Sequence, residues 1–148
     1  MRLVNGGSLR PSNQKLAVAG CFMAGCLGAY IELMRPKNLV LAGATVPLGA
    51  YFALMDSSQV FPFDAVVFHT LAVVFFTGAG NAMNDIKDAE IDLTAHPMRP
   101  LPSGRLSLAQ ASRFTAVLWI ASVFAHIAGL LSVPWEVSTY APTIGIYV

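Results

Sequence analysis

The segment 84–92 contains polar residues whose types and spacing suit metal-ion chemistry. Four of the chain's eight acidic residues fall within it. On a helix of 100° per residue, five Asn and Asp side chains share about 100° of arc. These are Asn81, Asn84, Asp85, Asp88 and Asp92. Carboxylates on one helix face repel each other, so we expect a cation beside them. Because Mg²⁺ binds carboxylate oxygens and substrate phosphates, the spacing predicts a metal–diphosphate site.

Basic residues near this segment could complete such a site. Arg35, Lys37, Arg99 and Arg105 are candidates, since a guanidinium fork matches phosphate geometry. Metal ions and cations also stabilise the charge that develops on a departing diphosphate. Two alternatives are a solvated acidic helix end and a proton relay. An EF-hand is excluded, because its ligands come from an irregular loop with a central glycine.

The composition indicates that this site lies at a membrane. Of 148 residues, 55% are hydrophobic and 11% are charged, whereas a soluble domain has roughly a quarter charged residues. The mean hydropathy is +0.61. We therefore predict an all-α integral membrane protein with three to four transmembrane helices of about 20 residues each. The net charge of +1 argues against nucleic acid as a partner.

Apolar runs and helix-breaking residues divide the chain into elements. Prolines and Gly104 predict a loop over 93–106, and Ser107 with Gln110 predicts a capping box that opens the next helix. The second span is expected to continue into the acidic segment. The predicted elements are a polar tail (1–15), an apolar interfacial or re-entrant segment (16–34), spans at 39–55, 65–83 and 108–131, and a partial span at 137–148.

The distribution of Lys and Arg predicts the orientation. The connections 55–64 and 132–140 contain none. The opposite ends of the predicted spans contain all of Arg35, Lys37, Lys87, Arg99, Arg105 and Arg113. Because cytoplasmic loops are enriched in Lys and Arg, we expect a multi-pass protein of the cell membrane with the acidic segment on the cytoplasmic side.

The acidic segment and the loop after it resemble a known family. The pattern Asn84-Asp85-x-x-Asp88-x-x-x-Asp92, followed by Arg-Pro-Leu-Pro-Ser-Gly-Arg at 99–105, is similar to the first aspartate-rich motif and loop of the UbiA superfamily of membrane prenyltransferases. The sequence segments 32–38 and 78–85 resemble those of the archaeal digeranylgeranylglyceryl phosphate synthase branch of this superfamily. The resemblance covers the chain from about residue 29.

This resemblance implies an enzyme with a multi-helix prenyltransferase bundle. It would transfer a geranylgeranyl group, with Mg²⁺, from the prenyl diphosphate to geranylgeranylglyceryl phosphate in ether-lipid synthesis. The motif implies Asp88 and Asp92 as catalytic residues, with Asn84 and Asp85 as further metal ligands. The residues expected to bind the substrate diphosphate or phosphate are Arg35, Asn81, Asn84, Arg99 and Arg105.

The chain also departs from the family pattern. The superfamily has a second aspartate-rich motif, whereas after Asp92 the only acid here is Glu136. We therefore expect residues 35–148 to be the N-terminal half of the membrane domain, as a fragment, a truncated product or half of a split enzyme. A separate C-terminal half is then an expected partner, and activity of this half alone stays open. Two alternatives are prenylation of an aromatic or quinone precursor and a non-catalytic subunit that binds prenyl diphosphate.

Overall fold

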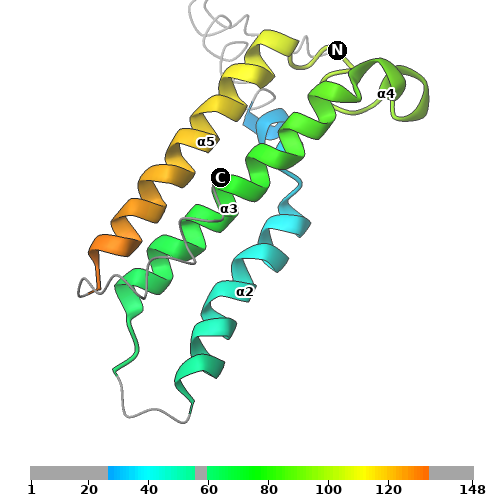
Figure 1. Ribbon diagram of the computed structural model, residues 1–148. Coiled ribbons are helices and arrows are strands. Elements are labelled where there is room, and N and C mark those ends of the chain that lie inside the picture. Colours follow the sequence, from blue (N-terminus) through cyan, green and yellow to red (C-terminus); the bar gives the residue numbers. More distant parts are fainter. Residues whose placement is uncertain (1–26, 56–59, 134–148) are drawn as a thin grey trace, which may run out of the picture.

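The computed structural model describes residues 27–55 and 60–133, a part of the chain that contains helices and no strand (Figure 1). The all-α prediction is therefore confirmed for it. The predicted tail 1–15 and partial span 137–148 lie outside the described residues. A short helix over 27–34 is followed by α2 (Pro36–Leu54), α3 (Phe63–Lys87), α4 (Ala89–Ala95) and α5 (Leu108–Leu131).

Helix α3 is the centre of the bundle and packs against both α2 and α5 (Figure 1). Glycines allow these contacts to be close. A Cβ atom added to Gly43 of α2 would lie 3.0 Å from Val74 Cγ2, and one added to Gly129 of α5 would lie 2.4 Å from the His69 ring. Such packing by small residues is typical of helices that associate within a bilayer.

Helices α2, α3 and α5 are each long and apolar enough to cross a membrane. Large side chains such as Val40, Leu41 and Phe124 point outward and are mostly exposed. A bilayer gives these side chains an apolar environment, while helical hydrogen bonding satisfies the backbone. The chain is thus an all-α integral membrane protein. The bounds of α5 coincide with the predicted third span, whereas α2 and α3 begin before the predicted residues 39 and 65.

The acidic segment does not form one uninterrupted helix, which corrects the sequence prediction. Asp88 (φ −88°, ψ 3°) separates α3 from α4. The hydrogen bonds continue through this break, since Asp88 N donates to Asn84 O at 2.9 Å and Asp92 N to Asp88 O at 2.8 Å. Asp88 therefore keeps backbone hydrogen bonds to both helices although its own dihedral angles are not helical. Helix α4 also includes residues 93–95, which were predicted to be loop.

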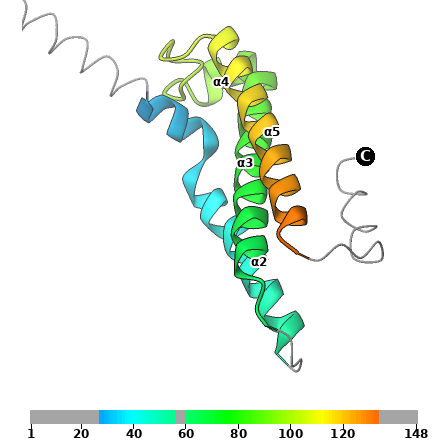
Figure 2. The same cartoon turned by 90° about the vertical axis from the view of Figure 1, so that its left-hand side faces the viewer.

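The helix over 27–34 packs onto the end of the bundle near α4, at an angle to α2 (Figure 2). Ala29 and Leu33 are fully buried in a small core with Ala82, Leu106 and Ala111. The described part of the predicted interfacial segment is therefore a packed helix. The predicted capping box at the start of α5 is confirmed, because Ser107 and Gln110 exchange backbone and side-chain hydrogen bonds. Leu106 in this core and the cap at Ser107 together fix the C-terminal end of the loop 96–106.

Candidate functional site

Two arginines and two aspartates form an ion-pair network where α3 passes into α4. Arg99 Nη1 lies 2.6 Å from Asp92 Oδ2 and 3.8 Å from Asp85 Oδ1, and Arg35 Nη2 donates to the same Asp85 oxygen. Asp85 and Asp92 are only 5% and 4% exposed. Buried carboxylates require charged or hydrogen-bonding partners. This arginine–aspartate network therefore ties α2, α3, α4 and the following loop together at one point.

An unusual backbone conformation places Arg35 in the network. Arg35 has a φ of 57° and is the only described non-glycine residue with a positive φ. This left-handed conformation costs about 1–3 kcal/mol in a non-glycine residue. Two residues of α3 support the adjoining backbone. The Asn81 side-chain amide donates to Met34 O at 2.8 Å, and Gly78 leaves room for Met34, whose Cε would lie 2.8 Å from an added Cβ.

Asn84 and Asp88 have different surroundings and are called here the open pair. Both side chains are exposed, and within the described part of the chain neither makes a side-chain hydrogen bond or ion pair. Over the same residues, no group of three or more His, Cys, Asp or Glu is positioned to hold a metal ion. Mg²⁺, however, commonly takes one or two protein carboxylates and completes its octahedron with water and substrate phosphate. The open pair fits that mode of binding.

Arg105 fastens the loop to the short N-terminal helix rather than joining the network. Its Nη1 donates to Glu32 Oε2 at 2.7 Å and its Nη2 to Met98 O at 2.7 Å. The hydrogen bond to Glu32 raises the pKa of the Arg105 guanidinium. The predicted phosphate ligand Arg105 is therefore occupied by Glu32, and the loop is connected to a segment 73 residues earlier in the sequence.

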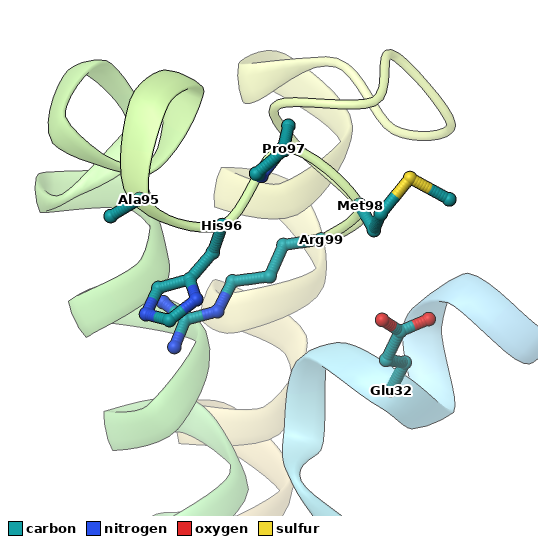
Figure 3. A pocket seen from close by; sticks show the side chains of 6 residues that line it. All are labelled: Glu32, Ala95, His96, Pro97, Met98 and Arg99. Carbon is teal, nitrogen blue, oxygen red and sulfur yellow. The ribbon is translucent and has the colours of Figure 1, made fainter.

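A pocket of about 300 Å³ lies between the loop and the short N-terminal helix (Figure 3). Its lining consists of Glu32, Ala95, His96, Pro97, Met98 and Arg99. A second, apolar pocket of about 390 Å³ lies between α3 and α5. Met83, Ile86 and Trp119 contribute to its wall. Met83 and Ile86 neighbour Asn84 and Asp85 in sequence, but at 100° per residue they lie on the other side of α3, so the apolar pocket and the acidic face share one end of the helix and not one face.

The structure separates the predicted site residues into groups. It brings Arg35, Asp85, Arg99 and Asp92 together, and leaves Asn84 and Asp88 open. Asn81 uses its amide donor on the backbone. The sequence prediction missed Glu32 as the partner of Arg105. A signal was present, because Glu32 is the only charged residue between 16 and 34.

Comparisons with known proteins place these features in context. The model of the UbiA prenyltransferase family matches residues 44–148. Digeranylgeranylglyceryl phosphate synthase of Methanobrevibacter smithii is 38% identical over 122 residues, covering 82% of this chain and 40% of that protein. The protein of the same name from Methanothermobacter thermautotrophicus is 42% identical over 107 residues, covering 71% and 36%. The chain thus spans about two fifths of their length. No solved structure matches.

Proposed function

Because the chain belongs to the UbiA prenyltransferase family, we propose that it forms the first diphosphate-binding part of a membrane prenyltransferase. The proposed reaction is Mg²⁺-dependent transfer of a geranylgeranyl group from its diphosphate to geranylgeranylglyceryl phosphate. The names of the similar archaeal proteins support this choice of substrates. The observation that carries the proposal is the open pair, Asn84 and Asp88, beside a network that contains two arginines.

The residues fit a metal held jointly by protein and diphosphate. Asn84 and Asp88 offer oxygen atoms that no other described side chain uses. Asp92, which pairs with Arg99 in this structure, is proposed to join the metal when substrate binds, whereas Asp85 is proposed to stay paired with Arg35 and to hold the site in shape. When bound, Mg²⁺ would neutralise the charge that accumulates on the departing diphosphate.

The arginines are proposed to respond to the incoming substrate. A diphosphate offers Arg99 an anion that matches its planar fork, and this would release the Asp92 carboxylate toward the metal. Arg35 would stabilise the same phosphates from α2, and Asn81 would hold the Arg35 backbone in place. Arg105 would contribute through the loop. In this scheme Asp88 and Asp92 are the acids on which turnover depends most.

The prenyl chain is proposed to lie among the helices. The apolar pocket between α3 and α5, which Met83, Ile86 and Trp119 line, lies at the same end of α3 as the acidic segment, on another face of the helix. Its apolar wall would shield part of the isoprenoid from water. By the distribution of Lys and Arg, the acidic end would lie in the cytoplasm.

The test is a transfer assay in nanodiscs with geranylgeranyl diphosphate and Mg²⁺. Geranylgeranylglyceryl phosphate and 4-hydroxybenzoate would be compared as acceptors. The assay would use the chain alone and the chain co-expressed with the C-terminal portion of an archaeal relative. We expect the geranylgeranyl group to be transferred to geranylgeranylglyceryl phosphate, and we expect EDTA to abolish this transfer. Transfer only to 4-hydroxybenzoate, or donor binding without transfer in both preparations, would contradict the proposal.

A further inference from the structure

The pocket lined by Glu32 and residues 95–99 contains hydrogen-bond donors that the rest of the site does not use. Arg99 pairs with Asp85 and Asp92 through Nη1 alone. Its Nε and Nη2, like the ring nitrogens of His96, have no hydrogen-bond partner within the described residues. His96 and Arg99 both line this pocket and reach it from the same loop (Figure 3). Two N–H donors in the wall of one pocket, one of them permanently charged, form the kind of arrangement that recognises phosphate.

The opposite wall of the pocket contains a carboxylate. Glu32 would repel an anion if its charge were unbalanced, but Arg105 lies 2.7 Å from it and offsets that charge. A carboxylate oxygen that already accepts one hydrogen bond can still accept another from a hydroxyl. The pocket thus presents cationic donors on one side and a hydroxyl acceptor on the other.

We propose that this pocket binds the head group of the acceptor, a phosphate monoester of a small polyol, with the phosphate on His96 and Arg99 and a polyol hydroxyl directed toward Glu32. The inference rests on the proposed prenyl transfer and adds a second anion position to it. The volume of about 300 Å³ accommodates a phosphate and a three-carbon polyol.

The position of Arg99 links this pocket to the diphosphate site. Arg99 lines the pocket and pairs with Asp85 and Asp92 through Nη1, and its Nε and Nη2 have no partner among the described residues. Two phosphate groups could then bind on different edges of one side chain. Such an arrangement would bring acceptor and donor head groups close together, and proximity of this kind lowers the barrier of a two-substrate reaction.

The experiment measures binding of sn-glycerol 1-phosphate to the full chain in phosphatidylcholine nanodiscs by calorimetry. Inorganic phosphate is titrated in a parallel arm, and nanodiscs containing a dialkylglycerol phosphate form a third arm that reports the lipid source. We expect His96→Ala to weaken binding of glycerol phosphate about tenfold or more, the usual effect of losing a charge-assisted hydrogen bond. His96→Gln keeps a donor and should recover part of the affinity.

Two further variants define the site. Lys87→Ala removes an exposed cation that does not line the pocket and should leave the affinity unchanged. Glu32→Ala should remove the preference for glycerol phosphate over inorganic phosphate. Melting temperatures would establish that each variant is folded, which is expected for the exposed His96.

Comparison with Mg²⁺–diphosphate binding separates this inference from the proposed function. Asp88→Asn should strongly weaken diphosphate binding and leave glycerol phosphate binding intact, whereas His96→Ala should weaken glycerol phosphate binding and leave diphosphate binding intact. Loss of both ligands in both variants would indicate a single anion site and overturn the inference. The absence of glycerol phosphate binding, or equal affinity in wild type and His96→Ala, would also overturn it, whatever the outcome for diphosphate.

Discussion

Two pairs of residues in the segment 84–92 have related chemistry but opposite surroundings. Asp85 and Asp92 are buried and paired with arginines, whereas Asn84 and Asp88 are exposed and unpaired among the described residues. Removing a carboxylate from water is unfavourable unless a partner compensates for it, so the buried acids help to organise the end of the bundle. The exposed side chains of Asn84 and Asp88 make no such contacts among the described residues. The comparison indicates that the buried pair organises the site before the ligand binds, and that the open pair is available to bind the ligand first.

The largest effect is expected from Asp88→Asn, which tests the open pair. Loss of this carboxylate should lower Mg²⁺-dependent diphosphate binding about a hundredfold or more, since metal coordination provides several kcal/mol. The melting temperature should hardly change, because Asp88 is exposed and has no side-chain partner in the described structure. Glu90→Gln removes the same charge from an exposed position in α4 and is the matched control. Equal losses in the two variants would mean that general charge, rather than Asp88, binds the metal.

The second-largest effect, on stability, is expected from Asp85→Asn, which tests the role of the buried pair. This change deprives Arg35 of its ion-pair partner and removes a buried charge-assisted hydrogen bond. We expect a loss of about 1–3 kcal/mol in the free energy of unfolding, measured by denaturation in mild detergent. Diphosphate binding should fall only in proportion to the unfolded fraction. If Asp85→Asn kept its stability but no longer bound diphosphate, Asp85 would be a ligand-binding residue, and the structural role proposed for it would be wrong.

The opposite end of the bundle provides a reference for purely structural effects. In Gly129→Ala, the new Cβ would lie 2.4 Å from the His69 ring, and overpacking of this kind costs about 1–3 kcal/mol. Gly49→Ala is the control, because nothing lies within 4 Å of a Cβ there. The second change His69→Ala should restore stability by removing the clash. We expect diphosphate affinity to stay constant throughout, and a change in it would show that the two ends are coupled.

Local patterns in the sequence predicted the parts of the fold that depend on neighbouring residues. Ser107 and Gln110 located the start of α5, since a capping box requires only residues three apart. Pro36 indicated the start of a helix, because proline suits the first turn. The all-α membrane class followed from composition alone.

Features that depend on contacts distant in sequence could not be predicted in the same way. The helical projection assumed a straight helix through Asp88, whereas α3 ends at Lys87 and α4 begins at Ala89. The buried acids Asp85 and Asp92 pair with Arg35 and Arg99, which come from other segments of the chain. The pairing of Arg105 with Glu32 and the hydrogen bond from Asn81 to Met34 O join residues 73 and 47 positions apart. The helical periodicity of a sequence contains no information about contacts between distant residues. The sequence therefore predicts that Asn81 binds phosphate, whereas its side chain donates to the backbone of Met34.

The smallest effect is expected from the ion pair between Arg105 and Glu32, in contrast to the buried network. Both side chains are exposed, by 41% and 47%, and exposed pairs contribute about 0–1 kcal/mol. A double-mutant cycle of Arg105→Ala and Glu32→Ala should therefore give a coupling energy within that range, and salt should reduce it further. The corresponding cycle of Arg35→Ala and Asp85→Ala should give a larger, less salt-sensitive value, because Asp85 is nearly buried. A coupling above about 2 kcal/mol for Arg105 and Glu32 would mean that the loop is fixed as firmly as the network, and that the pocket beneath it is rigid before any head group binds.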